Sequence, residues 1–174
     1  MLKYVDTKVT FSEVPDEISL CISISNCPNH CKGCHSPYLA EDIGKPLIEY
    51  PKNMLSDEYI IHIDELIEAN KGITCVCLMG GDNDVVLINV LASFIKKEHN
   101  LKVAWYSGKS YIEPFISFQY YDYIKIGPYK EEFGPLNSKT TNQRMYKVDV
   151  EHYDDGKFGY ELVDITKKFW KDDD

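Results

Sequence analysis

Three closely spaced cysteines are the residues of this sequence best suited to chemistry. Cys27, Cys31 and Cys34 are spaced C-x3-C-x2-C, directly after an apolar run over residues 20–24. Thiolates are the usual ligands of iron–sulfur clusters, and an electron-transfer [4Fe–4S] cluster is held by four of them. A loop that supplies three thiolates leaves one iron free to bind a group that is not protein. The spacing therefore predicts a [4Fe–4S] cluster that ligates a co-substrate.

The same segment allows a second interpretation, a structural zinc site. Cys27, Cys31, Cys34 and His35 form a Cys3His set, which zinc binds tetrahedrally. Zinc sites usually draw their second ligand pair from a dozen or more residues away, so that the metal joins separate elements. Here all four candidates fall between residues 27 and 35. The spacing favours the cluster, and a non-catalytic zinc-binding module stays as the alternative.

Composition sets the class of protein. The 174 residues are 44% hydrophobic, as in a globular chain, and predict a single domain. The formal net charge of −9 argues against a nucleic-acid-binding surface, which would be basic. No stretch has the roughly 20 apolar residues of a membrane span. The N-terminal residues lack the apolar centre of a signal peptide, so we expect a cytoplasmic protein whose thiols stay reduced.

Strand and helix patterns alternate along the first three quarters of the chain. Strands are predicted at residues 19–25, 73–78, 102–106 and 123–126. Helices are predicted at 57–69, capped by Ser56 or Asp57, at 84–99, and over a short stretch near 111–117. This order implies right-handed crossovers and a parallel sheet. Cys21, Cys75 and Cys77 fall inside strands and are expected to be buried as small hydrophobic residues.

The pattern changes after residue 135. Two further strands, at 145–150 and 158–165, flank a turn at 154–156 and predict a hairpin. We therefore expect one domain over residues 1–174, with a core at about 19–148 and a C-terminal extension at 149–174.

In parallel α/β folds, the loops that bind ligands follow the carboxyl ends of the strands. The distinctive residues of this chain fall there. The four predicted loops contain Cys27–Cys34, Met79–Asp82, Tyr106–Gly108 and Gly127–Tyr129. Taken singly, each segment could be a tight turn. Together they predict one site along a single rim of the sheet.

The second of these loops has features of a ligand-binding segment. Gly80 and Gly81 have no Cβ, so their carbonyl groups can approach a ligand that other residues would block. Asp82 adds a carboxylate that can pair with an ammonium group. Asp82 could also cap the following helix, and the two roles are compatible.

Four segments together resemble a known family. They are the cysteine loop with its Gly33-Cys34-His35 ending, the Gly80-Gly81-Asp82 loop, residues 105–108 (WYSG) and residues 141–144 (TNQR). In this order, over residues 20–148, the chain resembles the activating proteins of anaerobic (class III) ribonucleoside-triphosphate reductase, which belong to the radical S-adenosylmethionine (radical SAM) superfamily. It differs at residues 11–17, where the family carries Asp-Gly-Pro-Gly-x-Arg, and at Asp82, where glutamate is usual.

The resemblance implies a fold and a reaction. The fold is an α/β partial (β/α) barrel of radical SAM type, with a parallel central sheet and a short C-terminal β extension. Cys27, Cys31 and Cys34 hold a [4Fe–4S] cluster, and SAM chelates its fourth iron. One electron splits SAM into methionine and a 5′-deoxyadenosyl radical, which removes a hydrogen atom from a glycine of the reductase. No catalytic side chain is expected, because the cofactors carry the chemistry.

The resemblance also implies contacts and partners. Gly33 and His35 would flank SAM, and Ser107 would lie near its ribose or carboxylate. Gly80, Gly81 and Asp82 would hold the methionine ammonium. The expected partners are the glycyl-radical reductase and a small electron donor such as flavodoxin. Two alternatives stay open: a radical SAM enzyme that acts on another protein, a peptide or a small molecule, and the zinc-binding module described above.

Overall fold

The computed structural model describes residues 1–53, 58–152 and 157–170, which form an α/β fold around one nine-stranded mixed sheet. Its strand order is β4-β3-β1-β2-β5-β6-β7-β8-β9. The strands are β1 (Leu2–Thr10), β2 (Ser19–Ile24), β3 (Lys45–Glu49), β4 (Ile60–Ile61), β5 (Cys75–Met79), β6 (Lys102–Tyr106), β7 (Tyr123–Ile126), β8 (Arg144–His152) and β9 (Phe158–Asp164). The helices are α1 (Ile63–Ala69) and α2 (Val85–Phe94), with a π-helical turn η2 (Ile95–His99) and 3-10 turns η1 (Pro37–Ala40), η3 (Phe118–Tyr120) and η4 (Thr166–Phe169).

The centre of the sheet is parallel, as predicted. Strands β2, β5, β6 and β7 pair in parallel in chain order. The observed bounds of β6 and β7 coincide with the predicted strands at 102–106 and 123–126. The ends of the sheet are antiparallel, and the sheet is open rather than closed as a barrel.

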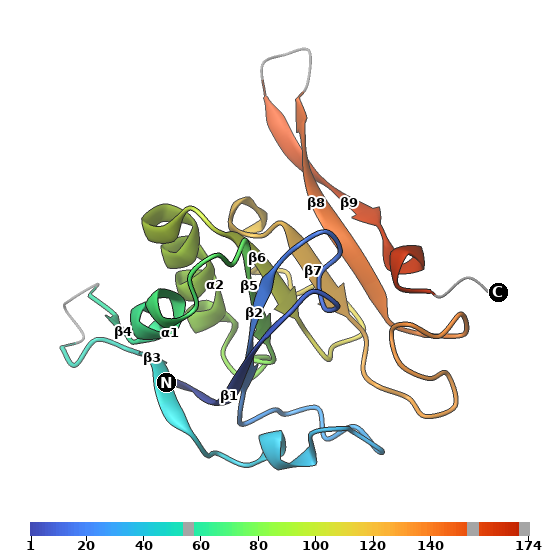
Figure 1. Ribbon diagram of the computed structural model, residues 1–174, viewed down its shortest axis with the longest axis horizontal. Coiled ribbons are helices and arrows are strands. Elements are labelled where there is room, and N and C mark those ends of the chain that lie inside the picture. Colours follow the sequence, from blue (N-terminus) through green and yellow to red (C-terminus); the bar gives the residue numbers. More distant parts are fainter. Residues whose placement is uncertain (54–57, 153–156, 171–174) are drawn as a thin grey trace.

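Alternate residues of the central strands face two different layers. One face carries Leu20, Ile22, Leu78 and Trp105, which pack with residues of α1 and α2 in the main core; these helices lie together on one side of the sheet (Figure 1). The opposite face carries Cys21, Cys75 and Cys77 in a smaller core with Val14 and Met145. The three strand cysteines are buried, which confirms their prediction as small core residues.

Several elements differ from the prediction. The sequence patterns missed β1, β3 and β4, although β1 lies inside the sheet between β3 and β2. The predicted helix at 57–69 begins only at Ile63, because residues 60–61 form β4, and its proposed caps Ser56 and Asp57 lie outside the described residues. The helical stretch near 111–117 contains Pro114, which has no amide hydrogen for a helix, and the observed 3-10 turn follows it at Phe118–Tyr120.

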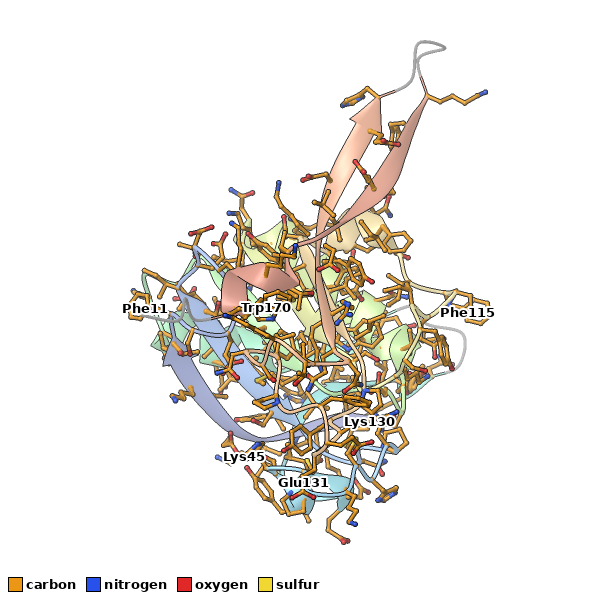
Figure 2. The ribbon with its side chains drawn as sticks, turned by 90° about the vertical axis from the view of Figure 1, so that its right-hand side faces the viewer. Phe11, Lys45, Phe115, Lys130, Glu131 and Trp170 are labelled. Atoms are coloured by element: carbon orange, nitrogen blue, oxygen red, sulfur yellow. The ribbon has the colours of Figure 1, made fainter. Side chains whose placement is uncertain are left out.

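The two strands predicted for the C-terminal hairpin are confirmed as β8 and β9, which project from the body of the molecule (Figures 1 and 2). The predicted turn at 154–156 lies outside the described residues. Strand β8 pairs with β7 only from Arg144 to Lys147, whereas its pairing with β9 extends to His152. It runs unbroken across the expected core boundary at 148/149. Within the described residues, no helix is long and apolar enough to cross a membrane.

Candidate functional site

A cavity of about 760 Å³ lies at the carboxyl ends of the four parallel strands. Each loop that follows β2, β5, β6 and β7 contributes to its wall, for example through Cys31, Gly80, Ser107 and Tyr129. Parallel strands bring their carboxyl ends to the same edge of a sheet, so these loops meet although they are far apart in the sequence. The structure therefore brings the four predicted loops together at one edge of the sheet.

All three cysteines of the first loop line this cavity. The loop is held to η1 by backbone hydrogen bonds, from the Cys27 amide to the Leu39 carbonyl (2.9 Å) and from the Asn26 amide to the Glu41 carbonyl (3.0 Å). Asn26 adopts a positive φ of 59°, a conformation that asparagine tolerates better than most residues. The main chain thus turns back sharply after β2 and carries the thiols to the cavity wall.

The donor chemistry at the cavity fits an iron–sulfur cluster. Among the described residues, no three His, Cys, Asp or Glu side chains lie close enough together to bind a single metal ion. Cys27, Cys31 and Cys34 nevertheless line one cavity from one loop. Thiolates that hold a cluster bind different irons, so they need not meet at one point as the ligands of a single ion do. Three thiolates would leave one of the four irons without a protein ligand.

Asp82 links three loops. Its side chain is only 6% exposed. One carboxylate oxygen accepts a hydrogen bond from the Ser107 hydroxyl (2.6 Å), and the other accepts hydrogen bonds from the Gly108 amide (2.8 Å) and the Asn29 side-chain amide (2.6 Å). The carboxylate predicted to face a ligand ammonium is therefore already bonded to protein donors. The helix cap is Asp84, whose side chain accepts from the Leu87 amide (3.2 Å), and not Asp82.

The two glycines of the pair have different surroundings. Gly80 lines the cavity, and its carbonyl accepts a hydrogen bond from the Trp105 indole (2.8 Å). Gly81 has a φ of +86°, and a Cβ there would overlap the Ile88 side chain, whose Cγ1 would be 2.6 Å away. Gly80 thus lies at the cavity wall, but glycine is required there by a φ of +107° and by the Ile24 carbonyl, which a Cβ would approach to 2.9 Å. Gly81 is required by the packing of α2 against the sheet.

Of the other three residues predicted to contact SAM, two line the cavity and one does not. His35 lines the cavity, with its ring 5.4 Å from that of Tyr129. Gly33 is not part of the cavity wall but lies beside Tyr129, since a Cβ at this position would be 3.4 Å from that ring. Ser107 lines the cavity and is buried; its hydroxyl donates to Asp82 and accepts from the Lys109 amide (3.0 Å).

Lys125 is a cavity residue that the sequence patterns did not single out. It lies on β7, is 8% exposed, and donates a hydrogen bond from Nζ to the Gly127 carbonyl (2.7 Å). Burial lowers the pKa of this amine to about 8. The sequence does contain a signal for this residue, because it is a lysine within a short strand that is otherwise apolar. In the cavity, its ammonium can pair with an anionic group of a ligand.

The lowered pKa of Lys125 predicts a pH-dependent stability. The unfolded amine keeps its ordinary pKa of 10.5, so between pH 8 and 10.5 the unfolded chain binds more protons and stability rises with pH. Below about pH 8 the penalty for the buried ammonium is fully present. We expect Lys125→Met to abolish this rise, so that the unfolding free energies of the two proteins converge by about 3 kcal/mol from pH 7 to pH 11.

Denaturant unfolding of the cofactor-free proteins at both pH values measures this effect. Groups that do not interact with Lys125 cancel in the difference. A difference that stays constant with pH would contradict the assignment of a buried, charge-bearing lysine.

No protein-family model, curated protein or solved structure matches this chain. The chemistry available at the cavity is therefore the basis for a functional conclusion. The cavity combines three thiols, the Gly80 backbone, the buried Lys125 and a histidine whose ring is tilted by 60° against that of Tyr129. This set can hold a thiolate-ligated metal cluster beside a small polar ligand.

Proposed function

We propose that this protein is a cytoplasmic radical SAM activase that generates a glycyl radical on an anaerobic ribonucleoside-triphosphate reductase. The observation that carries the proposal is the convergence of the three cysteines with the Gly80, Ser107 and Tyr129 loops on one cavity. The resemblance in sequence suggests the reaction, and a cavity at the expected edge of the sheet supports it.

Five of the cavity residues have a direct role in this proposal. Cys27, Cys31 and Cys34 hold three irons of a [4Fe–4S] cluster. Gly80 lets the main chain approach the methionine part of SAM, and the Lys125 ammonium neutralises its carboxylate. When bound, the cluster and SAM supply a reducing electron and the radical that removes a hydrogen atom from a glycine of the partner.

Four further cavity residues position and shield these groups. His35 packs against Tyr129, which presents planar surface on which an adenine can stack. Leu136 and Phe169 add apolar wall and help to exclude water. A small electron donor such as flavodoxin would deliver the electron.

The test is anaerobic electron paramagnetic resonance on the reduced protein with SAM and a candidate reductase. We expect 5′-deoxyadenosine and methionine as products and the doublet of a glycine-centred radical in the reductase. SAM cleavage without that doublet, with a correctly folded reductase present, would indicate a radical SAM enzyme with another substrate. No SAM cleavage under strong reductant would reject the enzyme class.

A further inference from the structure

Asn29 lies between two of the cysteines and has both of its amide hydrogens engaged. Its Nδ2 donates to the Asp82 carboxylate (2.6 Å) and to the Cys27 thiol sulfur (3.6 Å). A side-chain amide has two N–H donors, so this one nitrogen connects a cysteine to the carboxylate. The reversed amide would place its oxygen against the negative charge of Asp82, which fixes the orientation chemically.

The position of Gly108 supports the same contact independently. A Cβ at residue 108 would overlap the Nδ2 of Asn29 and lie 2.9 Å from its Cγ. Gly108 has no positive φ, so its backbone conformation would accept alanine. What excludes a side chain at this position is therefore the space that Asn29 occupies.

We infer that Asn29 is a positioning residue that clamps Cys27 to the Asp82 carboxylate. The loops after β2, β5 and β6 are thereby fixed to one another, with Ser107 and Gly108 as the other two donors. Asp82 then acts as the anchor of the site rather than as the partner of a ligand ammonium. The effect of Asn29 on a bound cluster, tested below, rests on the proposed function. The contacts of Asn29 with Cys27 and Asp82 do not.

Two double-mutant cycles on the metal-free protein test the clamp. We expect Asn29→Ala and Asp82→Asn each to lower the folding equilibrium constant about tenfold or more, because the first removes a donor to the buried carboxylate and the second removes its charge and turns an NH2 toward its donors. The double variant should lower this constant by clearly less than the product of the two single fold-changes. Gly108→Ala should destabilise the wild type and be nearly neutral in the Asn29→Ala background. Additive effects in both cycles would overturn the clamp.

The reduction potential of the reconstituted cluster tests whether the clamp reaches Cys27. Hydrogen bonds to ligating sulfurs tune this potential, and loss of a donor makes reduction harder. We expect Asn29→Ala to shift the midpoint to a lower potential. The control is Asn89→Ala. Asn89 on α2 also bridges elements, because its side chain donates to the Phe115 carbonyl and accepts from the Tyr121 hydroxyl, but it is not part of the cavity wall. This variant should lose stability without a shift in potential.

The outcomes separate the two hypotheses. An intact cluster with an unchanged midpoint in Asn29→Ala would overturn the link to Cys27. If the wild type takes up no cluster, the proposed function fails, while the two cycles still decide whether Asn29 ties its loop to Asp82 and Gly108.

Discussion

Replacement of Cys31 by alanine is expected to abolish the iron–sulfur cluster. After anaerobic reconstitution, the wild type should contain about four irons and four sulfides per chain, because its three thiolates hold three irons of a cubane. With two thiolates left, two irons lack a protein ligand, and we expect the iron content to fall at least tenfold. Iron and sulfide analysis with the visible absorption spectrum measures this, and Cys27→Ala and Cys34→Ala should behave in the same way.

The matched control is Cys21→Ala. Cys21 is also a free cysteine, but it is buried on β2 in the smaller core and is not part of the cavity wall. Burial raises the pKa of the Cys75 thiol to about 12, which keeps that sulfur protonated and unsuitable as a ligand. We expect Cys21→Ala to keep a full cluster. A full cluster in Cys31→Ala, or one colourless zinc in the wild type, would contradict the assignment.

Gly81→Val is expected to destabilise the fold strongly. A branched residue at a φ of +86° costs about 1–2 kcal/mol of backbone strain, and forcing its side chain into Ile88 adds about 1–3 kcal/mol of overpacking. The sum is a large fraction of a typical unfolding free energy of about 5–15 kcal/mol. Thermal or denaturant unfolding of the purified variant measures the loss.

Gly72→Val separates the two causes. Gly72 has a similar φ of +90°, but a Cβ there meets no atom within 4 Å. We expect it to show the backbone cost alone. Ile88→Ala in the Gly81→Val background should restore part of the stability by making room. If Gly81→Val proves as stable as Gly72→Val, the contact with Ile88 is not the constraint on this glycine.

The parts of the fold that were predictable are those in which local sequence and burial agree. Strands β6 and β7 are short apolar runs covered on both faces, so their bounds could be found without knowledge of their neighbours. Strand β1 contains Lys3, Asp6 and Lys8 and is mostly half-buried. Its pairing with β2 and β3 depends on partners elsewhere in the chain, and so its local pattern gave no signal.

The same distinction holds at the site. The cysteine spacing and the succession of strand-end loops are local, and they located the cavity. The atoms that require glycine at these two positions lie on other elements, the Ile24 carbonyl at Gly80 and the Ile88 side chain at Gly81. The roles of Asn29 and Asp82 depend on a contact between residues 53 positions apart. Such relations arise only when the loops are assembled.

The hairpin β8–β9 has a consequence for how the molecule opens. The pairing of β7 with β8 ends at Lys147, and the Val148 amide still donates to the Asp122 carbonyl (2.8 Å). The outer hairpin from Asp149 to His152 therefore has ladder hydrogen bonds only to β9 in the described chain. An isolated two-stranded ladder is marginally stable in water. Amide hydrogens of this outer part should therefore exchange with solvent through local separation of the two strands. Those of β5 and β6, buried at the centre of the sheet, should exchange only when the whole domain unfolds.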